Sequence, residues 1–163
     1  MEVLLASTNP HKLQEFREIL EPLGVAVVDL ASLSESFDEP LEDALTFAGN
    51  ARLKALGYAA NTGRVCVADD SGLSVDALDG RPGVMSARFA GSIGTRDERD
   101  AANNAMLLAL MDGVPDDKRS ARFECAVCVA DPNGTIINAK SSSISCSRRL
   151  ATSSALLNAT GLM

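Results

Sequence analysis

The stretch Val65-Cys-Val-Ala-Asp-Asp-Ser-Gly72 decides how the fold of the chain is interpreted. It begins with small and β-branched residues, which predict a buried strand over residues 65–68. Two adjacent carboxylates and a Ser-Gly pair follow directly, and these residue types favour a turn at the strand end. In an open α/β sheet ligands bind beyond the carboxyl ends of the strands, so we expect Asp69, Asp70 and Ser71 at the mouth of a cleft.

The two neighbouring acids suggest a cation. Adjacent carboxylates repel each other unless a proton or a cation intervenes, and ligands that are all oxygen suit Mg²⁺. Aspartate and serine are also ordinary turn formers, so a solvated turn is the alternative interpretation of the same residues.

Composition limits the class of protein. The 163 residues fit one domain, of one lobe or two, and the 46% hydrophobic and 23% charged residues are ordinary for a globular chain. The net charge of −7 argues against binding to nucleic acid or an anionic membrane surface. No run approaches the roughly 20 apolar residues of a spanning helix. The first six residues lack a basic segment, so we expect a cytoplasmic protein.

The four cysteines do not predict a metal site. Cys125 and Cys128 have CxxC spacing, but they fall in an alternating strand pattern that points them to opposite faces. No second pair is available for zinc, so we expect buried free thiols.

A second polar segment follows the first predicted strand, Val3 to Ala6. The loop Ser7-Thr-Asn-Pro-His-Lys12 leads into a helix that carries Leu13, Phe16, Ile19, Leu20 and Leu23 on one face. Asn9 or Thr8 can cap this helix and Pro10 suits its first turn, so its free N–H groups and Lys12 form a corner suited to phosphate. A plain helix start with an exposed lysine is the alternative.

The middle of the chain adds another candidate ligand. A second strand is expected at Val25 to Val28, and an acidic loop follows, in which Glu42 lies just before the next helix and is a candidate metal ligand. That helix is predicted from Leu41 or Thr46 to Ala60, with a buried stripe at residues 47, 51, 55 and 59. Asn50 and Lys54 share an adjacent face, one turn apart.

The second half of the chain predicts one helix and a hairpin. Thr95-Arg-Asp-Glu98 has the form of a capping box, and we expect its helix to pack through Ala101, Ala105, Leu108 and Met111 or their neighbours. Arg122 to Asp131 alternates as a half-buried strand, with Phe123, Cys125, Val127 and Val129 inward. Asp131-Pro-Asn-Gly134 predicts a turn, after which residues 135–139 pair back.

The C-terminal end differs in composition. Residues 132–163 contain no acid and three basic residues, Lys140, Arg148 and Arg149, whereas residues 1–131 carry all 22 acids. Serine dominates residues 141–154 without a clear period, which predicts a loop or a weakly ordered tail. We therefore divide the chain into a domain over residues 1–139 and an atypical tail over residues 140–163.

Five motifs in register carry a family resemblance. They are Ser7-Thr-Asn-Pro-His-Lys12, Thr46-Phe-Ala-Gly-Asn-Ala51 with Lys54, Ala68-Asp-Asp-Ser-Gly-Leu73, Arg81-Pro-Gly-Val-Met-Ser-Ala-Arg-Phe-Ala-Gly91 and Ala121-Arg-Phe-Glu-Cys125. Together they closely resemble the inosine triphosphate pyrophosphatase family, which acts on non-canonical purine nucleoside triphosphates, over about residues 2–139.

The resemblance implies an α/β fold with a long, mixed, curved sheet flanked by helices, two lobes around a central cleft, and usually a homodimer. It implies Mg²⁺-dependent hydrolysis of dITP, ITP or XTP to the monophosphate and pyrophosphate. The implied substrate-binding residues are Ser7, Thr8, Asn9, Pro10, His11, Lys12 and Ser71. Asp70 and Lys12 would be catalytic, Asp70 and Glu42 would hold the metal, and Arg88 would help to shape the pocket. Asp69 would share the field of the cation without touching it.

The chain also departs from the family pattern. Gly49 stands where members usually carry glutamate, and the Phe-Gly-Tyr-Asp and Ser-His-Arg motifs that close over the nucleotide are absent, His11 being the only histidine. The C-terminal part of the fold would then be incomplete and the activity impaired. One hypothesis is a shift of reading frame after Ala139, since CGT TTG GCT ACG AGN encodes residues 149–153 and reads Phe-Gly-Tyr-Glu in a neighbouring frame; the downstream DNA would test it.

Two other interpretations stay open. The chain can be a catalytically inactive, vestigial protein that binds a nucleotide without turnover. The septum-formation inhibitor group also has a first strand ending in Leu-Ala-Ser, but Ser-Pro-Arg-Arg typically follows there, and Asn9-Pro-His-Lys12 does not fit that pattern.

Overall fold

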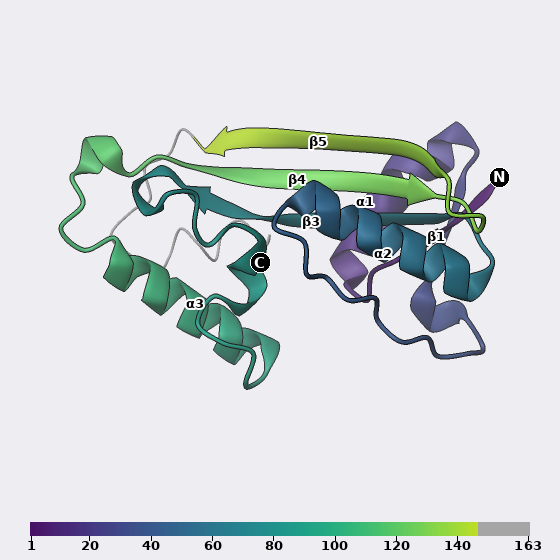
Figure 1. Cartoon of the computed structure of the whole chain (residues 1–163), viewed down its shortest axis with the longest axis horizontal. Coiled ribbons are helices and arrows are strands. Elements are labelled where there is room, and N and C mark those ends of the chain that lie inside the picture. Colours follow the sequence, from purple (N-terminus) through teal and green to yellow (C-terminus); the bar gives the residue numbers. More distant parts are fainter. Residues whose placement is uncertain (147–163) are drawn as a thin grey trace. The chain divides into compact units, whose positions relative to one another are not determined.

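The computed structural model describes residues 1–146, with side chains up to residue 143. In chain order its main elements are β1 (Glu2–Leu5), α1 (Pro10–Leu20), β2 (Ala26–Asp29), α2 (Phe47–Thr62), β3 (Cys66–Val75), α3 (Arg96–Leu110), β4 (Ala121–Ala130) and β5 (Ile136–Cys146). Short 3₁₀ turns connect several of them (Figure 1). Among the helices of residues 1–146, none is long and apolar enough to cross a membrane.

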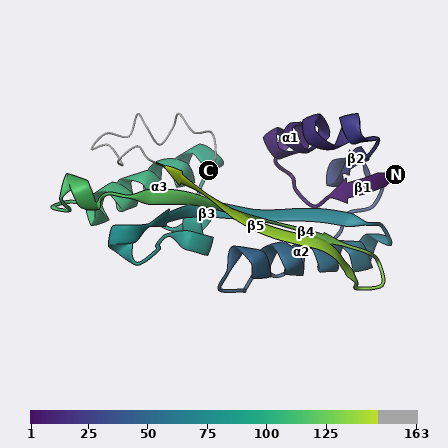
Figure 2. The same cartoon turned by 90° about the horizontal axis from the view of Figure 1, so that it is seen from above.

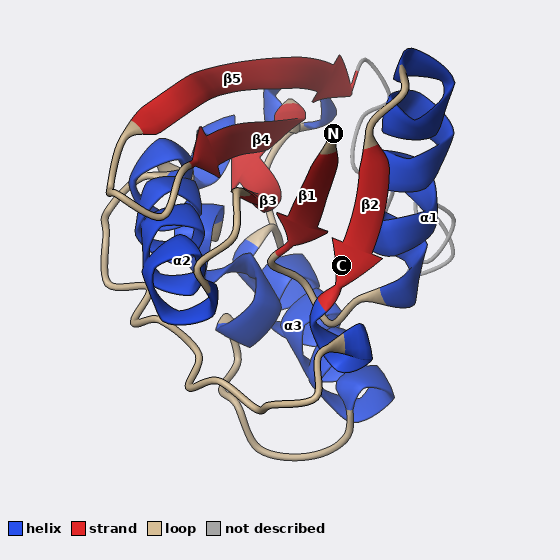
Figure 3. Ribbon diagram, turned by 90° about the vertical axis from the view of Figure 1, so that its right-hand side faces the viewer, coloured by secondary structure: helices blue, strands red, loops and turns tan. Residues whose placement is uncertain are grey.

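The five strands form one sheet in the order β2-β1-β3-β4-β5. β1 pairs in parallel with both β2 and β3 (Figure 3). A tight turn at residues 131–134 joins β4 to β5, which run in opposite directions (Figure 1). The sheet is therefore mixed and flanked by helices, as the sequence predicts.

The chain divides into two compact units. Among the described residues, the first contains residues 1–70 and 126–141, and the second contains residues 71–125 and 142–146. Each unit has its own cluster of buried apolar side chains.

In the first unit, α1 and α2 cover opposite faces of the sheet (Figure 2). Leu13, Phe16 and Leu20 of α1 pack on a buried cluster formed by Val3, Leu5, Val27 and Val67. Two further residues of the predicted apolar face, Ile19 and Leu23, are instead exposed. α2 buries the predicted stripe of residues 47, 51, 55 and 59. The buried face of α2 is rich in alanine, so this helix can approach the sheet closely.

In the second unit, α3 begins at the predicted capping box. Thr95 accepts a hydrogen bond from the Glu98 backbone N–H, and Glu98 accepts one from the Thr95 backbone. The predicted packing face is confirmed at Met111, which is buried, and wrong at Ala101 and Ala105, which are exposed. Neighbouring residues of the helix, Asn103, Asn104 and Leu107, are buried as well. Asn103 is buried because it holds the segment before α3, accepting from Ala90 N at 2.8 Å and donating to Ser86 O at 3.1 Å.

Three strand predictions need correction. β3 does not end at Ala68 but continues to Val75, because partners for Asp69 and Asp70 allow both acids to lie within a strand. The second correction concerns β4, which was predicted to be half-buried. Around residues 126–130 it is covered on both faces, since Ala126, Cys128 and Ala130 are buried while Val127 and Val129 also pack on the core.

The third correction concerns the end of the hairpin. β5 extends past Ala139 to Cys146, so residues 140–146 of the predicted tail form a strand. The part of that prediction that concerns residues 147–163 lies outside the described residues. The division between a domain and a tail at residue 140 stays a prediction.

Candidate active site

The pairing of β1 with β3 brings the first loop to the two aspartates. Leu5 is the partner of Val67, and Ala6 N donates to Val67 O at 2.8 Å. Two residues beyond this pair, in the same parallel register, Ser7 follows β1 and lies level with Asp69 of β3. The end of β1 therefore lies beside the start of β3, and the loop that follows β1 reaches the acidic pair.

The loop is organised as a helix cap. Asn9 N donates to Ser7 Oγ at 3.1 Å, and His11 N donates to Asn9 Oδ1 at 3.0 Å. The cap leaves Lys12 in the first turn of α1, with its side chain pointing back toward β3. A serine hydroxyl that accepts a hydrogen bond can also donate one, so Ser7 can still bind an anion.

The alternation of a strand separates the two aspartates. Val67 belongs to the core beneath α1, and residues 67 and 69 share one face of β3. Asp69 accordingly faces α1, where Lys12 Nζ lies 2.5 Å from its Oδ2. Asp70 points to the other face and reaches α2. The Lys12 ammonium is therefore the partner of the Asp69 carboxylate, and the prediction that Asp69 does not touch the metal stays a prediction.

Asp70 is held by an amide on α2. Asn50 Nδ2 donates to Asp70 Oδ2 at 3.1 Å, while Asn50 Oδ1 accepts from Ala44 N at 2.9 Å. Burial raises the pKa of Asp70 above its usual value of 3.8, against the opposing effects of the Asn50 hydrogen bond and the charges of Lys54 and Lys12. A carboxylate with a raised pKa is better suited to accept a proton near neutral pH.

Glu42 and Lys54 complete the cluster. Lys54 Nζ lies 3.0 Å from Glu42 Oε2 and donates to the backbone oxygen of Asp69 at 3.2 Å. The charge of Glu42 also contributes to the raised pKa of Asp70. The first unit therefore gathers two lysines and three carboxylates around the centre of β3.

These residues fit a magnesium ion only in part. Within residues 1–146 there is no group of three or more His, Cys, Asp or Glu side chains arranged to hold a metal. Glu42 and Asp70 supply an oxygen-only pair, and Mg²⁺ is commonly bound by one or two carboxylates together with phosphates and water. The donor set is therefore compatible with Mg²⁺ that arrives with a phosphorylated ligand.

The other predicted site residues differ in exposure. Ser71 follows Asp70 in β3 and is half-buried, and Thr8, Pro10 and His11 are exposed at the start of α1. Arg88 is exposed in the 3₁₀ segment Gly83–Arg88.

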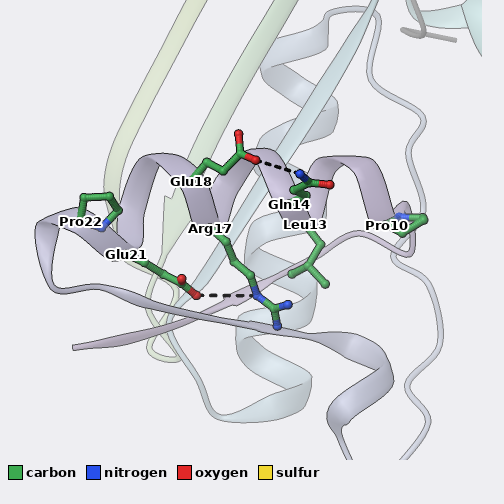
Figure 4. A pocket seen from close by; sticks show the side chains of 7 residues that line it. All are labelled: Pro10, Leu13, Gln14, Arg17, Glu18, Glu21 and Pro22. Carbon is green, nitrogen blue, oxygen red and sulfur yellow. Dashed lines mark hydrogen bonds and ion pairs between the residues drawn. The ribbon is translucent and has the colours of Figure 1, made fainter.

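A pocket on α1 lies apart from the predicted chemistry. It is lined by Pro10, Leu13, Gln14, Arg17, Glu18, Glu21 and Pro22 (Figure 4). Its polar groups are paired along the helix, Gln14 with Glu18 and Arg17 with Glu21, as expected for neighbours one turn apart. Of the predicted site residues, only Pro10 lines it.

Two members of the cluster received no role from the sequence. Asn50 and Lys54 are neighbours one turn apart on the predicted helix and belong to one of the five family motifs, but no chemical role was predicted for either. The signal that could have revealed them is that an asparagine and a lysine one turn apart lie next to the alanine-rich buried stripe of this helix.

Comparisons with known proteins agree on one family. The Ham1 family matches residues 3–144. The chain is 50% identical over 142 residues to the dITP/XTP pyrophosphatase of Desulforamulus reducens. This match covers 87% of this chain and 68% of that protein. It is 52% identical over 135 residues to the dITP/XTP pyrophosphatase of Nocardia farcinica, covering 82% and 64%.

Solved structures show the same fold. A HAM1 protein from Coxiella burnetii superposes with a TM-score of 0.77 at 33% identity, over 89% of this chain and 71% of that one. The nucleoside-triphosphatase, or dITP/XTP pyrophosphatase, of Mycobacterium abscessus gives a TM-score of 0.73 at 40% identity, with 89% and 71% coverage. The chain spans about two thirds of the length of the curated relatives it matches, 68% and 64% in the two cases above.

Proposed function

Because the chain belongs to the Ham1 family, we propose that it hydrolyses purine nucleoside triphosphates such as dITP, ITP and XTP to the monophosphate and pyrophosphate. Water would add to the α-phosphorus, and the bond to the β-phosphate would break with pyrophosphate as the leaving group. The observation that supports this most is the cluster around β3, in which Lys12, Lys54, Glu42 and Asp70 come from separate segments.

Each residue of the cluster has a role in this proposal. Asp70 accepts the proton of the attacking water, and Asn50 holds the carboxylate in place for that step. Lys12 and the first turn of α1, with Ser7 to His11, bind the triphosphate and neutralise charge on its oxygens. Ser71 contacts the substrate beside Asp70.

Magnesium belongs to the same proposal. Glu42 and Asp70 would hold the ion, which when bound would offset the negative charge of the phosphates. Lys54 already offsets the charge of Glu42 in the protein without metal. The predicted homodimer stays a prediction.

A pyrophosphate-release assay tests the proposal. The purified chain is incubated with dITP and Mg²⁺, and Asp70→Asn is the matched control because it keeps the size of the side chain and an oxygen for Asn50. We expect the variant to lose activity by about 10²- to 10⁴-fold, the usual contribution of a general base. Equal release by the two proteins would contradict the role of Asp70, and no release by either would contradict the proposed reaction.

The second candidate is a protein that binds nucleotides without turnover. It is favoured by the sequence, which contains a single histidine, His11, and neither of the two family motifs that close over the base. It predicts calorimetric binding of dITP without pyrophosphate release. If catalysis does occur, the missing donors predict weak discrimination between dITP and dATP, which the ratio of their kcat/KM values measures.

A further inference from the structure

Asp69 contacts both lysines of the cluster, but through different atoms. Its carboxylate oxygen Oδ2 lies 2.5 Å from Lys12 Nζ, and its backbone oxygen accepts from Lys54 Nζ at 3.2 Å. Lys54 has a carboxylate partner of its own, Glu42, at 3.0 Å. Each lysine is thus paired with a different acid.

The Asp69–Lys12 pair is unequal in burial. The side chain of Asp69 is 6% exposed, whereas that of Lys12 is 28% exposed. A carboxylate so deeply buried needs a compensating cation, and the ammonium of the more exposed Lys12 side chain is that cation. A lysine side chain is otherwise flexible, with about 2 kcal/mol of rotamer entropy, so this contact restricts where the ammonium can lie.

We propose that Asp69 is a positioning residue for Lys12, fixing its ammonium at the first turn of α1 where the phosphates of the substrate bind. The inference rests on the proposed function for the identity of that ligand. Asp69 acts only through Lys12 and does not touch the substrate. Its neighbour Asp70, on the opposite face of β3, has the separate role of accepting a proton.

The paired arrangement offers an internal control. Asp69→Asn removes the charge that holds Lys12 but keeps the backbone oxygen that accepts from Lys54. Glu42→Gln removes the carboxylate that holds Lys54 and leaves the Lys12 pair intact. An amine held against a carboxylate is shielded from reagents, so the rate of acetylation by acetic anhydride, followed for each lysine by peptide mass spectrometry, reports on each pair.

We expect Asp69→Asn to speed acetylation of Lys12 several-fold and to leave Lys54 unchanged, and Glu42→Gln to do the reverse. An unchanged rate at Lys12 in Asp69→Asn would overturn the proposal, as would an equal rise at both lysines, which indicates a loosened fold. Asp69→Glu retains the charge and should keep Lys12 as slow to react as in the wild type, which covers the case in which Asp69→Asn does not fold.

Turnover supplies the second readout. Misplacing a charge at a reacting centre costs rate more than binding, so we expect kcat for dITP to fall about 10- to 100-fold in Asp69→Asn, with a smaller rise in KM. A rise in KM with an unchanged kcat would contradict a positioning role. If the wild-type chain releases no pyrophosphate, the proposed function fails, and the acetylation rates still decide whether Asp69 holds Lys12.

Discussion

At the scale of single residues, the most informative feature is the difference between Asp69 and Asp70. They are the same amino acid at consecutive positions, yet one is paired with an ammonium and the other with an amide. At Asp70, burial raises the pKa against the opposing effects of the Asn50 hydrogen bond and the charges of Lys54 and Lys12. The environment, and not the residue type, makes one acid the partner of Lys12 and the other a candidate base.

The same reasoning predicts a pH effect at Asp76 in the second unit. Hydrogen bonds from Ser120 and Arg122 lower the pKa of Asp76 below its usual value of 3.8. The folded state therefore favours the ionised carboxylate, and this contribution to stability is complete above pH 3.8 and is lost as the pH falls through the lowered pKa.

We expect the melting temperature of Asp76→Asn to fall less than that of the wild type when the pH is taken from neutral to below 3.8. Ser120→Ala, which removes one of the two donors, should give an intermediate result. An equal fall in melting temperature for wild type and Asp76→Asn across this pH range would contradict the prediction.

At the scale of the elements, helix ends do much of the positioning. Asn9 caps α1, Thr46 caps α2 through Gly49 N, and Thr95 caps α3. The first two caps place Lys12 and Asn50 within the opening turn of each helix, so that their side chains reach β3. Capping residues could be recognised in the sequence because serine, threonine and asparagine are favoured there for a local physical reason.

The third cap belongs to the second unit and contains none of the lysines and carboxylates of the site, so it can be tested separately. Thr95→Ala removes the acceptor for Glu98 N and is expected to lower the free energy of unfolding by about 1 kcal/mol. Thr95→Ser keeps the hydroxyl and is the matched control. Urea unfolding measures both, and a Thr95→Ala protein as stable as Thr95→Ser would show that the capping box contributes nothing.

At the scale of the whole molecule, buried thiols report on opening of the first unit. Cys66 and Cys128 are 0% and 1% exposed. Burial raises the pKa of the Cys66 thiol to about 11 and also raises the pKa of Cys128. Both features make a thiol unreactive, because the thiolate is the nucleophile.

We therefore expect iodoacetamide at neutral pH to leave Cys66 and Cys128 unmodified in the native protein, and to modify both once denaturant unfolds it. Peptide mass spectrometry distinguishes them from the half-buried Cys125. Labelling of Cys66 at the same rate with and without denaturant would contradict the described packing.

The sequence predicted much of this molecule because its signals are local. The caps at Asn9 and Thr95, the alanine stripe of α2 and the turn at residues 131–134 each depend on neighbouring residues, and all were confirmed. The end of β3 was predicted wrongly because acids and serine favour turns, while their partners Lys12 and Asn50 are 57 and 20 residues away. Such partners override local preference and are invisible to a pattern search.

The candidate site shows the same limit. Asp70, Lys12 and Glu42 were chosen for their residue types and family motifs, and the structure brings all three to one cluster. Neither the pairing of Lys12 with Asp69 nor the contact between Asn50 and Asp70 could be predicted, because each depends on which face of β3 a helix covers.

The alternation of β3 has a consequence for how the family can diverge. Asp69 and Asp70 are consecutive, so covalent geometry alone fixes their spacing, with Cα atoms about 3.8 Å apart. Substitutions in α1 or α2 can shift either helix slightly without altering that spacing, because long lysine side chains absorb the difference. A single residue inserted between Val67 and Asp69 would instead exchange the two faces and turn Asp69 toward α2. Away from Asp69 and Asp70, the strand should therefore tolerate substitution better than a change of length.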